Sequence, residues 1–368
     1  MSLRKVVFRV DASLQMGTGH VMRCLTLADL LQREGVECHF VCREHPGHLL
    51  EVVSRRGHAV HRLPLDAQAP AAAHERQTAH AGWLGAHWQT DLQHTAEVVR
   101  SVQPQWVVVD HYALDAAWER QLKRAGCRIL VVDDLADRPH DCDMLVDQTV
   151  GRQPAAYQGL VPRGCRLLTG AHHALLRPEF GRMRPESLSR RRARLAVQHV
   201  LVTMGGVDQH NVAVKVLRSL DECALPEGAH VTVVMGRTAP WLAQVREQAA
   251  GMRCPVQVLV DVQDMAQLMA SCDVAIGAAG STSWERCCLG VPTLMLVLAD
   301  NQRAVAAALE AEGAAVVLGD PDTGPPRIAA ALEMLRDPAR LGAMIERAGA
   351  VTDGRGAETV LRFMLDER

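Results

Sequence analysis

Short apolar runs alternate with amphipathic segments along the first half of the chain. Residues 21–34 place apolar side chains on one broad face, which predicts a helix. The runs on either side of it are nearly continuous in apolar residues, as is typical of strands that helices cover on both faces. Strands are therefore predicted at residues 5–10, 37–42, 106–110, 128–133 and 144–146.

The second half repeats this pattern. It predicts strands at residues 197–204, 230–235, 256–260, 274–276, 293–297 and 315–318, and helices at 211–221, 265–271, 282–289 and 301–312. Regular alternation of strand and helix favours parallel, doubly wound α/β sheets, and eleven strands are too many for one comfortable open sheet. We therefore expect two Rossmann-like domains that face a cleft, with ligands bound at the carboxyl ends of the strands.

A change in composition separates the two halves. Residues 176–194 are rich in Arg, Pro and Ser, and their basic run at 190–194 is interpreted as a solvated linker. The domain boundary is placed there. The prediction is a first domain at residues 1–180, a second at 195–352, and a terminal helix at 353–368 that packs back on the first domain.

A second irregular stretch lies within the first domain. Residues 64–82 are rich in Ala, His and Gln and lack apolar periodicity. They predict a long loop before a helix at 92–102, and long loops in compact domains are often functional.

Composition narrows the class of protein. Apolar residues make up 48% of the 368 residues and the net charge is −2, so a sizeable core is expected and strong nucleic-acid binding is not. Arg9 and Asp11 interrupt the first apolar run, and the longest such run, near 291–299, is too short to cross a bilayer. Eleven cysteines without a CxxC pair favour free thiols in a reducing cytosol over disulfides.

The first candidate site follows the first predicted strand, in the segment DASLQMGTGH. Gly17 and Gly19 let the backbone turn tightly, and Thr18 and His20 lie where the next helix begins. Met22 stands where a dinucleotide-binding fingerprint requires glycine, which weakens that interpretation. A histidine here is suited to proton transfer near neutral pH. The alternative is that His20 only caps the helix.

Polar residues also end two later strands of the first half. Asp110 and Tyr112 follow the apolar run at 106–109 in VVVDHY, where side chains face the ligand crevice of a parallel sheet. The alternative is that Asp110 caps the next turn and Tyr112 packs beneath it. For Asp133 and Asp134, which end the next strand, capping is the favoured interpretation.

The second half carries glycines at a strand end. Gly205 and Gly206 follow its first strand, with Asp208 two residues on, and such a turn allows the backbone to approach a phosphate closely. Further along, Asn301 and Gln302 open a helix, and their amides suit sugar hydroxyls, although they are also unremarkable as caps.

The segment AAGSTSWE is the strongest signal by local chemistry. Gly280, Ser281 and Thr282 open a helix with backbone N–H groups and hydroxyls that suit a pyrophosphate, and Glu285 suits two ribose hydroxyls. The alternative is a capping box, since Thr282 and Glu285 have its spacing. That alternative explains the hydroxyls but not the glycine.

With these motifs assembled, the chain resembles the UDP-2,4-diacetamido-2,4,6-trideoxy-β-L-altropyranose hydrolases of pseudaminic acid biosynthesis, relatives of the GT-B glycosyltransferases. The resemblance rests on GTGHVMRCLTLA, GWLGAH, VVVDHY, TMGGVD, AAGSTSWE and DNQ and covers nearly the whole chain. It implies that His20 is the catalytic histidine and that Tyr112 and Asn301 lie near the sugar. It also assigns the nucleotide-binding loops to Gly205, Gly206, Gly280, Ser281 and Glu285. Residues 64–82 depart from the family pattern.

The resemblance implies hydrolysis of a UDP-sugar at the anomeric carbon–oxygen bond, with inversion. His20 would accept the proton of the attacking water, and Asp11 or Tyr112 would orient His20 or the water. No motif demands a metal or a cofactor, no membrane or nucleic-acid partner is expected, and the protein is expected to be a monomer or weak dimer. The alternatives are a GT-B glycosyltransferase, a UDP-sugar 2-epimerase and a non-catalytic nucleotide-sugar-binding protein.

Overall fold

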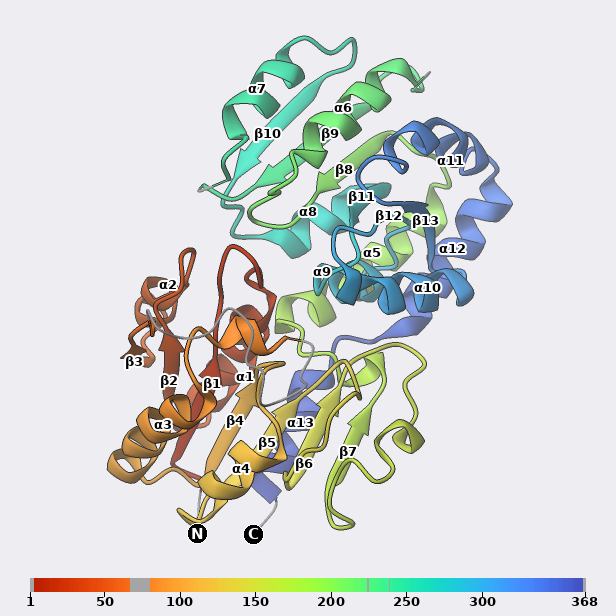
Figure 1. The fold of residues 1–368 in the computed structure, drawn as a ribbon. Helices are drawn as coiled ribbons and strands as arrows, with labels where there is room; N and C mark the ends of the chain where they lie inside the picture. The colour runs from red at the N-terminus through yellow and green to blue at the C-terminus, as the bar shows by residue number, and fades with distance from the viewer. Residues whose placement is uncertain (1–2, 67–79, 224, 238, 367–368) are drawn as a thin grey trace. The chain divides into compact units, whose positions relative to one another are not determined.

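A computed structural model describes residues 3–66, 80–223, 225–237 and 239–366 of the chain. Two compact units divide it: Met1–Leu175 together with Arg355–Arg368, and Leu176–Gly354. Each unit holds a parallel sheet covered by helices (Figure 1). Most of the loop predicted at 64–82 lies outside the described residues.

The sheet of the first unit has the strand order β3-β2-β1-β4-β5-β6-β7, and all neighbours are parallel. The direction of winding reverses between β1 and β4, which is the point where ligands bind in sheets of this kind. The strands are β1 (Lys5–Val10), β2 (Glu37–Arg43), β3 (Ala59–Leu63), β4 (Trp106–Asp110), β5 (Arg128–Val132), β6 (Met144–Asp147) and β7 (Arg166–Thr169).

Helices cover both faces of this sheet, as the continuous apolar strands predicted. On one face, α1 (Gly19–Arg33), α2 (Leu50–Arg55) and α13 (Gly356–Asp366) share a core with the strands. Here the last helix of the chain lies against α1 (Figure 1). On the other face, α3 (Trp88–Val102) and α4 (Ala116–Lys123) pack around a second core.

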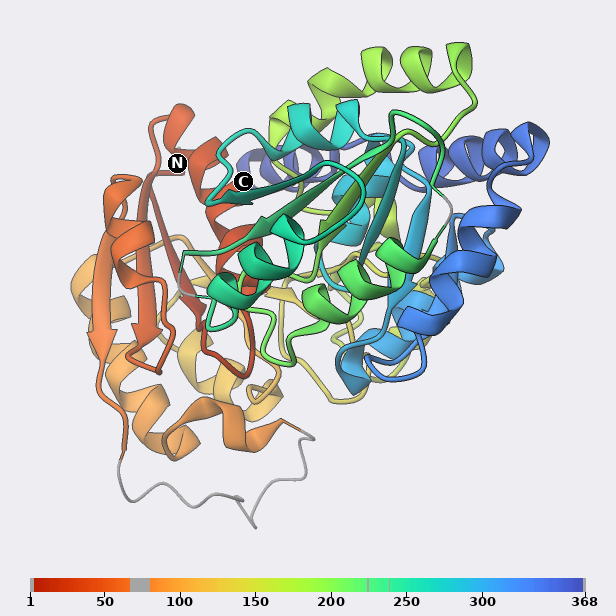
Figure 2. The same ribbon diagram turned by 90° about the horizontal axis from the view of Figure 1, so that it is seen from above.

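The second unit has the strand order β10-β9-β8-β11-β12-β13, and its winding reverses between β8 and β11. In Figure 2, α6 and α7 cover one face of this sheet, and α5 and α8 lie on the other. The strands are β8 (His199–Thr203), β9 (His230–Met235), β10 (Val256–Val260), β11 (Val274–Ala278), β12 (Thr293–Leu296) and β13 (Ala315–Gly319). The helices are α5 (Pro178–Ala193), α6 (Val212–Glu222), α7 (Leu242–Ala250), α8 (Met265–Ser271), α9 (Thr282–Cys288), α10 (Arg303–Ala311), α11 (Ile328–Met334) and α12 (Pro338–Val351).

The arginine-rich stretch is a helix of the second unit, so the prediction of a solvated linker is wrong. Arg191 of α5 is almost fully buried. Its guanidinium donates to the carbonyl oxygens of Met269 (2.7 Å), Cys272 (2.7 Å) and Leu289 (3.1 Å). These carbonyls end α8 and α9, where helices leave acceptors unpaired. The basic run therefore caps two neighbouring helices.

All eleven cysteines are free thiols, and most are buried. Within the described ranges no helix is long and apolar enough to cross a membrane. In the same residues no group of three or more His, Cys, Asp or Glu side chains is placed to hold a metal ion.

Candidate active site

The loop after β1 places His20 in the first turn of α1. Gly17 has a positive φ of 76° and donates its N–H to the carbonyl oxygen of Ser13 at 2.8 Å, which closes a tight turn. Thr18 precedes the helix without a capping hydrogen bond from its side chain, and Gly19 is the first helical residue. His20 thus lies inside the helix and is not its cap.

His20 is held by a buried carboxylate. Its Nδ1 lies 2.6 Å from Oδ1 of Asp110, the last residue of β4. The same carboxylate accepts Nε of Arg23 at 2.6 Å and Nη2 of Arg23 at 2.7 Å. Burial alone would raise the pKa of Asp110, but the charge of Arg23 and the hydrogen bonds from Arg23 and His20 hold it far below its usual range. Asp110 is therefore a permanent anion between two side chains of α1.

This arrangement assigns the tautomer of His20. Because Asp110 is ionised and can only accept, Nδ1 of His20 carries a hydrogen, and Nε2 is the ring nitrogen left to exchange a proton. The imidazole side chain is 11% exposed, whereas that of Asp110 is fully buried. A carboxylate behind Nδ1 of a partly exposed imidazole is the geometry of a general base.

Tyr112 completes the support of His20. Its ring meets the imidazole edge-on, with 4.7 Å between centroids and an interplanar angle of 78°. Its hydroxyl donates to Oδ2 of Asp134 at 3.1 Å, and the same oxygen lies 2.5 Å from Nη1 of Arg23. Burial, with the nearby Asp134 carboxylate, raises the pKa of Tyr112 well above its usual value. Tyr112 is therefore a donor and a packing surface, not a base.

Two more aromatic side chains lie beside Tyr112. His80 precedes a short 3₁₀ helix, Ala81–Leu84, and Trp83 lies within it. The ring of His80 lies 4.3 Å from that of Trp83 and 5.3 Å from that of Tyr112, between centroids. Both are only partly buried. They form an aromatic cluster next to His20 that sequence reasoning missed.

Of the two residues predicted to orient His20 or the water, Asp11 and Tyr112, only Tyr112 contacts His20. One oxygen of its buried carboxylate accepts the backbone N–H of Arg43 at 2.6 Å and lies 2.7 Å from Nη1 of Arg9. The other oxygen faces Nε2 of His111 at 3.3 Å. Asp11 thus belongs to a buried charge network on the other face of the sheet.

The alternation of side chains along a strand explains why Asp110, and not Asp11, contacts His20. Val10 and Asp110 are register partners on β1 and β4, and successive residues of a strand face opposite sides. Val6, Phe8 and Val10 belong to the core under α1, so Asp110 points to α1 as well. Asp11 and His111, one residue later, both point to the opposite side.

In the second unit, the glycine turn after β8 is open. Gly205 has a φ of 86°, and a Cβ at Gly205 or Gly206 would meet nothing within 4 Å. Asp208, which follows this turn, binds the start of the next helix. Its two carboxylate oxygens accept the backbone N–H groups of Val212 (2.8 Å) and Ala213 (2.9 Å), so Asp208 caps α6.

The turn after β11 presents the residues predicted for a diphosphate. Gly280 has open space around its Cα, and Ser281 is exposed and precedes α9 without a capping hydrogen bond from its side chain. Thr282 is already the first helical residue, so the capping box with Glu285 does not form. Burial raises the pKa of Glu285, which lies 3.6 Å from Nη2 of Arg177.

Asn301 and Gln302 lie in a 3₁₀ turn, Asp300–Gln302, just before α10. Asn301 is exposed at this turn. Oε1 of Gln302 accepts the backbone N–H of Leu298 at 2.9 Å. Gln302 therefore holds the loop after β12, and Asn301 is the amide that faces solvent.

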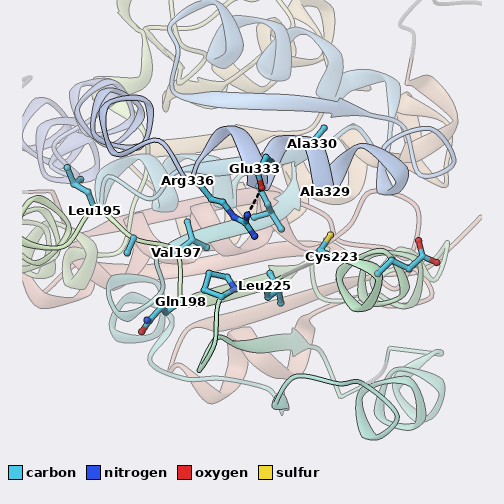
Figure 3. Close-up of a pocket in the computed structure, with 13 residues that line it drawn as sticks. Leu195, Val197, Gln198, Cys223, Leu225, Ala329, Ala330, Glu333 and Arg336 are labelled. Carbon is cyan, nitrogen blue, oxygen red and sulfur yellow. Dashed lines mark ion pairs between the residues drawn. The ribbon is translucent and has the colours of Figure 1, made fainter.

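A pocket of about 690 Å³ lies elsewhere in the second unit (Figure 3). Residues 195–198, the end of α6 and α11 line it, and Glu333 and Arg336 form an ion pair of 2.8 Å there. Residues 195–198 lead into the amino end of β8, whereas Gly205 follows its carboxyl end. None of the predicted site residues lines this pocket.

Comparison with known proteins supports the predicted relationship. Residues 199–359 match the glycosyltransferase family 28 C-terminal domain. The chain is 23% identical to the UDP-2,4-diacetamido-2,4,6-trideoxy-beta-L-altropyranose hydrolase of Campylobacter jejuni, over 84% of this chain and 97% of that protein. These two matches confirm the resemblance drawn from the motifs.

Solved structures match almost the whole chain. The crystal structure of Acinetobacter baumannii MurG superposes with a TM-score of 0.71 at 14% identity, over 99% of this chain and 100% of that one. The UDP-GlcNAc 2-epimerase of Neisseria meningitidis, bound to UDP-GlcNAc, gives a TM-score of 0.60 at 12% identity, over 99% and 100%. The fold is GT-B-like, as predicted.

Proposed function

We propose that this relative of the altropyranose hydrolases cleaves a UDP-linked 2,4-diacetamido-2,4,6-trideoxy sugar with water. The observation that carries the proposal is the His20–Asp110 pair. It lies at the reversal point between β1 and β4, and with Nδ1 of His20 bound to Asp110, Nε2 is the proposed base. A protein that only bound the nucleotide sugar would not need a buried anion to fix the tautomer of a partly exposed histidine.

The proposed step is a single displacement. A water oxygen bonds to the anomeric carbon as the bond from that carbon to the phosphate oxygen breaks, and UDP leaves with the electron pair. The water proton passes to Nε2 of His20, and Asp110, 2.6 Å from Nδ1, stabilises the imidazolium that forms. Attack opposite the leaving group inverts the anomeric centre.

The second unit is proposed to hold the nucleotide. The open turns at Gly205–Gly206 and Gly280–Ser281 expose backbone groups that suit a diphosphate. UDP is a stable anion, so its departure needs charge stabilisation more than a strong acid. Glu285, beside Arg177, is the proposed acceptor for ribose hydroxyls.

The sugar is proposed to meet the aromatic cluster. His80, Trp83 and Tyr112 offer ring faces beside His20. The acetamido methyl groups and the deoxygenated C6 of such a sugar are apolar and suit these rings. Asn301 is the proposed amide partner of a sugar polar group.

The test is release of UDP from the UDP-sugar without any acceptor, with NMR detection of the sugar product. We expect UDP and the free sugar of inverted configuration from the wild type, and little of either from His20→Ala. His172→Ala, at an exposed histidine of the same unit, is the matched control and should remain active. A UDP-linked epimer, UDP release only with an added acceptor, or binding without turnover would each overturn the proposal.

A further inference from the structure

A buried cation lies behind the proposed diphosphate turns. Arg286, on α9, has no exposed surface. Its Nη2 donates to the carbonyl oxygen of Ala278 at 2.7 Å and to Oγ of Ser283 at 3.1 Å. Nε and Nη1 have no hydrogen-bond partner among the described residues.

The surrounding backbone makes room for this guanidinium. A Cβ at Gly277 would collide with Nη1 of Arg286 and would lie 2.9 Å from the carbonyl oxygen of Thr203. Thr203 ends β8, and Gly277 is the penultimate residue of β11. The cation therefore lies where β8 and β11 end, next to the turns that carry Gly205 and Gly280.

Arg286 forms no ion pair with a carboxylate in the described part of the chain. Burial lowers its pKa to about 10, so the guanidinium remains charged at neutral pH. Burial raises the pKa of the neighbouring thiols of Cys272 and Cys287, which are therefore neutral. The adjacent Glu285 raises the pKa of Arg286 through its charge, but its carboxylate forms an ion pair with Arg177 at 3.6 Å and not with Arg286.

Arg191 shows how this unit otherwise buries an arginine. It is also almost fully buried and lacks a carboxylate partner among the described residues, yet Nε, Nη1 and Nη2 each donate to a carbonyl oxygen. Arg286 has one carbonyl and one hydroxyl, both for Nη2. An unpaired buried charge is costly, so it calls for an anion nearby.

We propose that Arg286 is a positioning residue for a bound diphosphate, whose negative charge it complements from beneath the two glycine turns. It does not touch the ligand. It fixes the Ala278 carbonyl and the Ser283 hydroxyl, and its field favours the anion over a neutral ligand. The identification of that anion as the diphosphate of UDP rests on the proposed function.

The test compares ligands of increasing charge on the full-length protein. Uridine, UMP, UDP and inorganic pyrophosphate are titrated into wild type and Arg286→Met. We expect the affinity for UDP and pyrophosphate to fall on the order of 10- to 100-fold, that for UMP to fall less, and that for uridine to stay unchanged. Arg184→Met is the matched control, because Arg184 donates to the Cys288 carbonyl at the other end of α9 (2.7 Å).

Two results would overturn the inference: equal losses for uridine and UDP, which indicate a merely structural role, or no loss for pyrophosphate. A third result separates the two proposals: pyrophosphate binds the wild type and binds Arg286→Met more weakly, but UDP binds neither. That result refutes the proposed function and leaves the inference standing.

If Arg286→Met does not fold, Arg286→Lys replaces it. Burial lowers the pKa of an ammonium group, so pyrophosphate affinity should fall from pH 7 to pH 9 more steeply in this variant than in the wild type. Parallel pH profiles would contradict the proposed role of the charge.

Discussion

Asp110→Asn changes one charge at the centre of the proposed site and almost no volume. The wild-type carboxylate accepts Nδ1 of His20 and two nitrogens of Arg23. An amide has one acceptor oxygen and a donor NH₂ group, so it cannot serve both partners. Either His20 loses the bond that fixes its tautomer, or Arg23 faces a donor.

The expected loss of activity follows from that geometry. A positioned general base contributes about 10²–10⁴ in rate, or about 2.7–5.4 kcal/mol, and Asp110→Asn should remove most of it. Removal of one partner of a buried ion pair also costs about 3–5 kcal/mol of stability. Arg23 keeps its contact with Asp134 at 2.5 Å, so we expect the lower end of that range.

The assay is single-turnover UDP release by wild type, His20→Ala, Asp110→Asn and the double variant. Thermal unfolding of each variant sets a temperature at which all are folded. If His20 and Asp110 act as one unit, the double variant is no slower than the slower single variant. UDP affinity should be unchanged in all four. Multiplicative losses in the double variant, or near wild-type turnover by Asp110→Asn, would refute the proposed pairing.

Three further predictions concern stability and the nucleotide. Gly277→Ala forces a Cβ against the guanidinium of Arg286 and should lower stability by about 1–3 kcal/mol in thermal unfolding, whereas Gly280→Ala has open space and should not. Glu285→Ala should weaken UDP binding by about ten- to a hundredfold in calorimetry with the fold intact; unchanged affinity would return Glu285 to a structural role. Burial, with the Asp134 carboxylate, raises the pKa of Asp147 to about 6. The folded protein therefore keeps a proton there that the unfolded chain loses near pH 4. Between about pH 4 and 6 the wild type should lose about 3 kcal/mol of unfolding free energy relative to Asp147→Asn, as measured in urea; equal slopes would contradict this.

The sheets were predictable because buried parallel strands are apolar on both faces. All eleven strands predicted from apolar runs occur, while the short strands β3 and β7, which carry polar residues, were missed. The helix α5 was missed for another reason. Arg190 and the buried Arg191 donate to carbonyl oxygens at the end of α8, and Arg191 also to one at the end of α9, an arrangement that exists only in the tertiary structure.

The sequence predicts that the site residues follow the ends of strands, but it does not predict which of their side chains contact one another. The order of residues brought His20 and Tyr112 to the same sheet edge, where the structure finds them in contact. The choice between Asp11 and Asp110 depends on which face of the sheet each side chain points to. That choice follows from the register of β1 against β4, which local pattern does not contain.

Buried arginines recur in this chain, among them Arg9, Arg23, Arg191 and Arg286. A buried charge requires a partner. Arg9 has Asp91 and Asp11, Arg23 has Asp110 and Asp134, and Arg191 has three carbonyl oxygens. Arg286 stands in the same kind of environment, and two of its nitrogens find no partner in the described residues. The pattern that explains the other three therefore points, for Arg286, to a negative charge that arrives with the ligand.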